Sequence, residues 1–295
     1  MKETIFYLEG RGGMYIYHFF IYNLGGLCYI LNNKYDICVP NTSKLLKDKG
    51  KIVKYPTTNI KLPIKIYMED ILPFQREAFE IIKDKFELIE DLNKIPDYEI
   101  VSIYGETCQN DGLSDNPKII FPFIRNLFHE KYNYKMINGK RIFITRKNSE
   151  SQHNGVLKRY ILNENEIKNM LNKYNFEFIQ LENYNTNEKI KLFMESEVII
   201  SSHSSSLTLS IFSNKNCKII EILNKGTQGF PNNHYINICN TVGINYNRYS
   251  NINEDNNGNF NLNVTDFDNY LIKLLYNENS NINGRIFKGI YRKYR

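Results

Sequence analysis

The sequence predicts an α/β protein with two domains, each built on a doubly wound, Rossmann-like sheet. The chain of 295 residues is long enough for two modest domains. From about residue 139, short apolar segments alternate with amphipathic helical segments through short links, which is typical of a parallel sheet covered by helices. The chain also begins with a strand-like segment, a glycine turn and an apolar helical segment, so the same unit recurs in the first half.

The second half shows the alternation most clearly. Strands are predicted over 141–145, 176–181, 198–201 and 218–223, and helices after residue 163 and over 189–195 and 207–213. Asn163 and Glu166 have the spacing of a capping box that opens the first of these helices. In doubly wound sheets, ligands bind beyond the carboxyl ends of the strands. Arg146, His203 and Glu221 all fall there.

The first half is less regular but supports a second α/β domain. We predict strands over 4–8 and 99–104 and helices over 14–31, 69–85 and 117–131. The join lies near residues 135–140, which gives an N-terminal domain over 1–138 and a second domain over 139–250.

The last segment, 251–295, is predicted to hold an Asn-rich loop, a helix and a basic tail. Residues 251–263 have no periodicity, and Thr265 is placed to cap a helix that runs to Tyr276. We expect this C-terminal helix to return toward the N-terminal domain.

Composition narrows the classes of function. The formal net charge of +6 favours phosphate-bearing partners, yet no dense run of Lys and Arg precedes the last eleven residues, which argues against a nucleic-acid binder. The five cysteines are odd in number and lack a C-x-x-C pair, so neither a zinc site nor a disulfide framework is indicated. The sequence shows no targeting or membrane-spanning segment, and we expect a cytoplasmic protein.

The stretch Ser201-Ser-His-Ser-Ser-Ser206 stands between a predicted buried strand and a helix. Free backbone N–H groups, the helix dipole and the hydroxyls at such a turn form an anion site that suits nucleotide phosphates. The alternative is a serine-rich helix cap with His203 packed locally.

Common catalytic motifs do not fit the chain. Gly10-Arg-Gly-Gly13 departs from G-x-G-x-x-G, so a dehydrogenase is disfavoured. His129-Glu130 lacks the second histidine of a zincin helix, and the chain has neither a G-x-S-x-G elbow nor a P-loop. The remaining set is Arg146, Arg159, His203 with its serines, and Glu221.

That set, in that order, resembles glycosyltransferase family 61. The matching pieces are Ile144-Thr-Arg146, Lys158-Arg159 before Asn163-Glu164, Ile190 to Phe193, Val198 to Thr208, and Ile219-Ile-Glu221. Tyr15-Ile-Tyr-His18 is also similar to an N-terminal segment of the family. The chain departs from the family pattern at Ser204 and Ser206, which replace glycines, at Leu209, which replaces Asn, and at Lys189, which replaces Gln.

The resemblance implies a GT-B architecture with a nucleotide-sugar, most simply a UDP-sugar, on the second domain and a glycan or protein acceptor facing the first. It implies that Arg146 and Arg159 bind the diphosphate, which suits guanidinium geometry. The turn of Ser204, Ser205 and Ser206, together with His203 and Thr208, would complete the phosphate site. Glu221 would reach the ribose, or else be a buried structural carboxylate.

An inverting transfer needs a base on the acceptor side, and Glu9 and His18 are the candidates. His18 has a structural alternative, as a core histidine of an apolar helix. We expect no metal: the one Asp-x-Asp pair, Asp266 and Asp268, is predicted to form the acid-rich first turn of a helix.

Two other functions stay open at the level of sequence. The serines that replace glycines fit a degenerate module that binds a glycan or nucleotide without turnover. The basic tail 284–295 fits a scaffold that docks on acidic partners or membrane surfaces.

Overall fold

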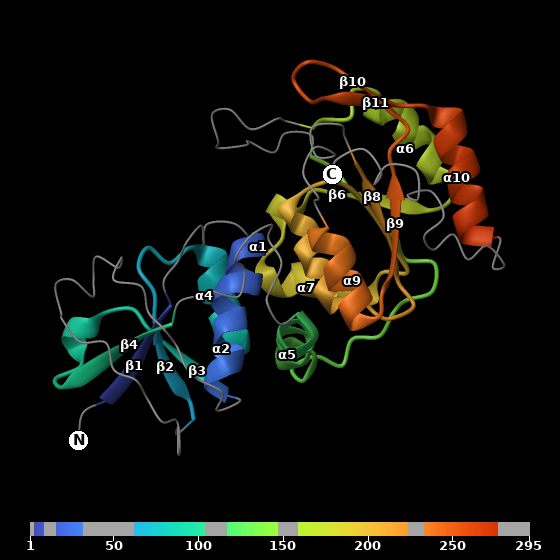
Figure 1. The fold of residues 1–295 in the computed structure, drawn as a ribbon. Coiled ribbons are helices and arrows are strands. Elements are labelled where there is room, and N and C mark those ends of the chain that lie inside the picture. The colour runs from blue at the N-terminus through green and yellow to red at the C-terminus, as the bar shows by residue number, and fades with distance from the viewer. Residues whose placement is uncertain are drawn as a thin grey trace, which may run out of the picture.

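The computed structural model describes residues 3–8, 16–31, 62–103, 117–146, 159–223 and 233–276. Two parallel sheets and a small hairpin lie in these ranges, and Figure 1 shows the sheets apart, with helices between them. Mixed α/β structure with parallel sheets is therefore confirmed. No helix within these ranges has the length and apolar composition needed to cross a bilayer.

The second sheet has five parallel strands in the order β6-β5-β7-β8-β9. These are β5 (Arg141–Ile144), β6 (Phe176–Ile179), β7 (Val198–Ser202), β8 (Lys218–Ile222) and β9 (Asn245–Tyr249). The chain winds outward from β5 to β6 and then in the opposite direction through β7, β8 and β9. The carboxyl ends of β5 and β7 therefore flank the topological switch point, where such sheets bind ligands.

Helices cover both faces of this sheet because apolar residues continue along its strands. Phe143, Ile200 and Ile220 pack toward α6 (Glu164–Asn172) and α10 (Val264–Tyr276). Ile199 and Ile219, on the other face, pack with α7 (Thr186–Glu195), η5 (Ser205–Phe212) and α9 (His234–Val242). The sheet is thus doubly wound, as buried parallel strands require.

The first sheet has four parallel strands in the order β3-β2-β1-β4. These are β1 (Glu3–Leu8), β2 (Ile64–Tyr67), β3 (Phe86–Ile89) and β4 (Tyr98–Ile103). The associated helical elements are α1 (Ile16–His18), η1 (Phe19–Asn23), α2 (Leu24–Leu31), α4 (Pro73–Ile81), η2 (Leu92–Lys94) and α5 (Pro117–His129). The helix predicted over 14–31 is interrupted, because η1 is a π-helical turn directly after His18.

One apolar cluster joins the helices of the two sheets. It includes Phe20 of η1, Phe128 of α5 and Phe212 of η5, whose rings contact one another. A Cβ atom on Gly25 would lie 3.0 Å from Ile120, so glycine permits α2 and α5 to approach this closely. The shared core fixes α1 and η1 against η5, the element that carries the serine turn.

Polar contacts at the ends of η5 and α7 strengthen this interface. Arg125 of α5 donates to the carbonyl oxygens of Ile211 and Ser213, at 2.6 and 2.7 Å. Glu77 of α4 accepts from the Thr186 N–H at the start of α7, at 2.7 Å. Side chains from the first half therefore satisfy backbone groups that the ends of both second-half elements leave unpaired.

The C-terminal helix is placed differently from the prediction. Helix α10 does not return toward the first sheet but lies beside α6 at the second sheet, as Figure 1 shows. Phe267 and Leu271 are buried there with Tyr249. The apolar face of α10 covers one side of the second sheet. The pattern of the strands did not show that this side needed a cover.

Local predictions near the C-terminus also need correction. Residues 252–262 form an antiparallel hairpin, β10 (Ile252–Glu254) with β11 (Phe260–Leu262), where a loop was predicted. Helix α10 begins at Val264, and the side chain of Asn263, not Thr265, accepts from the Asp266 N–H at 3.1 Å. Asn163 uses its side chain on the backbone of Leu262 and does not cap α6.

Candidate functional site

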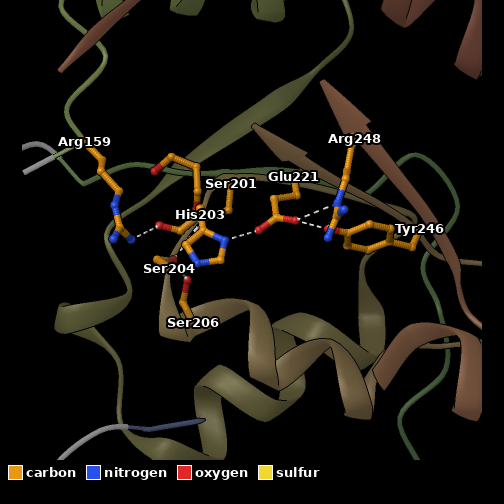
Figure 2. Close-up of polar contacts among 9 residues, drawn as sticks. Arg159, Ser201, His203, Ser204, Ser206, Glu221, Tyr246 and Arg248 are labelled. Carbon is orange, nitrogen blue, oxygen red and sulfur yellow. Dashed lines mark hydrogen bonds and ion pairs between the residues drawn. The ribbon is translucent and has the colours of Figure 1, made fainter. Parts of the chain in front are cut away.

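The candidate site lies at the switch point of the second sheet. Arg146 follows the end of β5, and His203 follows the end of β7. Arg159 reaches the same place and donates from Nη1 to the carbonyl oxygen of His203 at 3.0 Å, as Figure 2 shows. Arg146 and His203 thus follow strand ends, as the sequence predicted, and Arg159 joins His203 from the segment before α6.

The two arginines are held close together in a partly buried setting. Burial is the main cause that lowers the pKa of each guanidinium, and the positive charge of Arg146 lowers the pKa of Arg159 further. The Nε atoms of both are buried and have no hydrogen-bond partner among the residues that the structure describes. Two like charges with unused donors at one point favour an anion that can accept from both.

The backbone at Arg159 is unusual for a residue with a large side chain. Its φ of 57° lies in the left-handed region, which costs a non-glycine residue about 1 to 2 kcal/mol. The hydrogen bond to His203 is one contact that holds the side chain in this conformation. Such strain at a cluster of cations supports a functional role for the position.

The serine turn joins β7 to η5. Ser204 is the N-cap residue of η5, but its side chain does not cap the helix and instead contacts the hydroxyls of Ser206 and, at 3.5 Å, of Ser201. The first backbone bond of the turn runs from the Leu207 N–H to the Ser204 oxygen at 3.0 Å. The N–H groups at the start of a helix lack acceptors within it, so those of Ser205 and Ser206 can bind an anion.

The element after this turn is a 3₁₀-helix over eight residues, where a helix from 207 to 213 was predicted. Thr208 is fully buried within it, and its hydroxyl has no partner within the described part of the chain. Thr208 therefore belongs to the interior of η5 and not to the exposed turn.

Glu221 is completely buried at the end of β8 and holds a polar network. One carboxylate oxygen pairs with Nδ1 of His203, and the other accepts from the hydroxyl of Tyr246 and lies 3.5 Å from Nε of Arg248. Figure 2 shows the His203 ring between Glu221 and the Ser204–Ser206 turn. The network links the edge strand β9 to the anion site.

An aromatic bridge connects His203 to the first half of the chain. Tyr235 of α9 is buried, with its ring 5.2 Å from that of His203 and 6.2 Å from that of Tyr17. The Tyr17 hydroxyl lies 3.1 Å from Nδ1 of His234. Burial and then the charge of Glu221 raise the pKa of Tyr235, so its hydroxyl stays protonated beside the two arginines.

The residue next to Tyr17 is His18, one of the two predicted acceptor-side residues. His18 follows Tyr17 on α1 and contacts the ring of Tyr22, with ring centroids 4.8 Å apart. Burial, followed by the charge of His234, lowers the pKa of His18, so its imidazole is neutral at pH 7. Glu9, the other predicted base, lies outside the described residues.

Sequence reasoning missed Tyr235, Tyr246 and Arg248. The first lies on α9, which follows a segment without a clear pattern, and the other two lie on β9, whose alternation is polar on both faces. Gly243, at φ 74°, ends α9 in the left-handed conformation and leads the chain directly into β9. That glycine was the available signal for this helix–strand unit.

Fold and site together define an α/β protein with two arginines and a serine turn at the switch point of a doubly wound sheet. Residues 107–220 match the model of the family described as Glycosyltransferase 61, which confirms the similarity that the sequence predicted. The matched segment contains both arginines and the serine turn, and it ends one residue before Glu221. A search of curated proteins finds no match.

The family match supports glycosyltransferase activity, and with it a sugar donor and an acceptor. It covers less than half of the chain and none of β9. The family match therefore gives no information about Tyr246 and Arg248, and their part in the polar network comes from the structure alone.

Proposed function

We propose that the protein transfers a sugar from a nucleotide-sugar, most simply a UDP-sugar, to a hydroxyl of a glycan or a protein. The observation that carries this proposal is the pair of partly buried guanidiniums, Arg146 and Arg159, whose charges act on each other and whose Nε atoms have no partner among the described residues. Within a segment that matches a glycosyltransferase family, the donor diphosphate is the anion that fits them.

The arrangement suits the departure of a nucleoside diphosphate. As the sugar leaves, negative charge develops on the diphosphate, and fixed cations and backbone donors at that point lower the barrier. Binding the donor would also relieve the repulsion between the two arginines. The same groups would therefore both bind the donor and stabilise its leaving group.

The acceptor would approach from the side of α1. We propose an inverting transfer in which His18, or Glu9, the next residue in the sequence after β1, takes the proton of the acceptor hydroxyl. The lowered pKa of His18 suits this role, because a neutral imidazole accepts a proton at pH 7. The ring contacts of Tyr17 with Tyr235 support a position near the donor site.

We further propose a GT-B arrangement, with an N-terminal domain over 1–138 and a donor domain over 139–250. The described strands of the first sheet all precede residue 104, and those of the second lie between 141 and 249, which supports this division. Residues 251–276 pack on the second sheet through β11 and α10, so the proposed donor domain includes them.

We propose that the transfer needs no metal ion. This proposal is supported by Arg146, Arg159 and the turn, which would neutralise the diphosphate in place of a metal cation. The carboxylates of the one Asp-x-Asp pair bind other groups, since Asp266 accepts from Asn251 at 2.7 Å and Asp268 accepts from Tyr174.

A thermal-shift panel of nucleotides and nucleotide-sugars tests the proposal. A ligand that binds only the folded protein raises its melting temperature, and at 100 times Kd the stabilisation is about 2.7 kcal/mol. We expect UDP and one or more UDP-sugars to raise it. If no nucleotide raises it at millimolar concentration, the donor site is wrong.

Hydrolysis of the donor separates an enzyme from a binding module. Slow release of free sugar from the UDP-sugar that binds would support catalysis, whereas binding without any release would favour the degenerate module. Deletion of 284–295 should leave donor binding unchanged, which would remove support for a scaffold that acts through its tail.

A further inference from the structure

The strand register places three polar residues in one row across the second sheet. Ser201 of β7 pairs with Glu221 of β8, and Glu221 pairs with Arg248 of β9. Register partners in a parallel sheet point to the same face, here the face of η5 and α9. Tyr246 lies two residues before Arg248 and shares that face. Its hydroxyl donates to the Glu221 carboxylate and accepts from Nε of Arg248 at 2.9 Å, and Arg248 also forms an ion pair with the carboxylate.

The carboxylate of Glu221 is fully engaged by this row. Its side chain has no exposed surface, whereas that of Arg248 is 20% exposed. One of its oxygens contacts His203, and the other contacts Tyr246 and Arg248. Glu221 is therefore not available to the hydroxyls of a ribose, and its effect on a ligand must pass through His203.

The charges of this network predict how each of its residues affects His203. A buried carboxylate is costly unless cations and donors compensate it, and Arg248 and Tyr246 do so at one oxygen. The more of the negative charge they neutralise, the less of it acts on the imidazole at the other oxygen. The contact at Nδ1 also fixes the ring, so that its opposite edge faces the serine turn, as Figure 2 shows.

We propose that Glu221 is a positioning residue that acts through His203, and that Tyr246 and Arg248 set the pH at which His203 becomes a cation for the donor phosphates. The second part rests on the proposed donor site. Tyr235 of α9, through its ring, and Arg159, through the His203 carbonyl, also contact His203.

The test is a titration of the His203 ring by NMR in ¹³C-histidine-labelled protein without nucleotide. The signal is assigned by its loss in His203→Gln. In Glu221→Gln the titration midpoint should fall by about one pH unit or more, because a negative charge in contact is removed. In Arg248→Gln it should rise by about half a unit, because a positive charge that neutralises the carboxylate is removed.

A merely structural role would not shift the titration midpoint in opposite directions in Glu221→Gln and Arg248→Gln. Tyr246→Phe, a change that keeps the ring, should raise the midpoint in the same direction as Arg248→Gln. The matched control is Arg141→Gln at the far end of β5, which should leave it unchanged. If Glu221→Gln fails to fold, the two β9 variants decide the matter. Shifts of equal sign in Glu221→Gln and Arg248→Gln, or no shift in the β9 variants, overturn the relay.

A second measurement tests the link to the donor. UDP should bind more tightly as the pH falls through the His203 midpoint, and in Arg248→Gln this tightening should begin at higher pH. If the NMR midpoint moves but the pH dependence of UDP binding does not, the link is overturned. If UDP fails to bind the wild-type protein at all, the proposed donor site fails, and the relay is still judged by the titration alone.

Discussion

Arg159 donates a hydrogen bond to the main-chain oxygen of His203, at 3.0 Å, and so connects the segment before α6 to the turn after β7. The bond uses Nη1, while the buried Nε has no partner among the described residues. One arm of the guanidinium therefore fixes its position, and the donor at Nε is the one that the proposed donor would use.

Replacing Arg146 with Ala should weaken UDP binding by about 1.5 to 3 kcal/mol, the range for charge-assisted hydrogen bonds. The residue lies just past β5 and makes no described ion pair, so the fold should be kept. Isothermal titration calorimetry measures the affinity. Arg141→Ala, which removes an arginine at the other end of the same strand, is the control and should bind UDP normally. Equal affinity in wild type and a folded Arg146→Ala would remove Arg146 from the site.

The acid limb of the pH–activity profile should depend on His234. A base must be unprotonated, and the pKa of His18 is lowered below 6.5, so activity should fall only as the pH drops through that lower value. His234→Gln removes the positive charge that helps to lower this pKa, so the limb should move to higher pH. His129→Gln, at the end of α5, where the ring contacts the Phe212 carbonyl oxygen, should leave the limb in place. An acid limb that stays in place in His234→Gln would argue against His18 as the base and favour Glu9.

Chelation should not stop the reaction. We expect transfer to continue in excess EDTA, because arginines and backbone donors are proposed to neutralise the diphosphate. Asp266→Asn with Asp268→Asn should lower the free energy of unfolding by about 1 kcal/mol through loss of the charged contacts to Asn251 and Tyr174, without abolishing turnover. Activity that disappears with EDTA and returns with Mn²⁺ or Mg²⁺ would contradict the metal-free mechanism.

Arg125 should contribute much more to stability than an exposed arginine. Its guanidinium donates to two carbonyl oxygens at the end of η5, so Arg125→Met should lower the free energy of unfolding by about 2 to 4 kcal/mol. Arg76→Met is the matched control: its ion pair with Glu90 is exposed and should be worth at most about 1 kcal/mol. Urea unfolding measures both. Similar losses in the two variants would show that the contact between α5 and η5 is not a stabilising one.

Prediction from sequence succeeded where a local pattern carried the information. The strands over 141–144, 198–202 and 218–222 and the turn after Ser202 follow from apolar runs and the serines between them. It failed for β9, whose polar residues alternate without an apolar face, and for α10, whose apolar stripe does not say which sheet it covers. The hairpin at 252–262 was hidden because its strands have only three residues each.

The sequence by itself determined the α/β class, the order of the second-sheet elements from β5 to β8 and the positions of Arg146, His203 and Glu221 at strand ends. It did so because periodicity and strand-end position are properties of neighbouring residues. Only the tertiary structure decided that Glu221 serves His203, that Arg248 and Tyr246 share its carboxylate, and that Tyr17 of α1 meets Tyr235 of α9. These contacts join residues far apart in the chain, and they depend on strand register and helix packing, which no local pattern specifies.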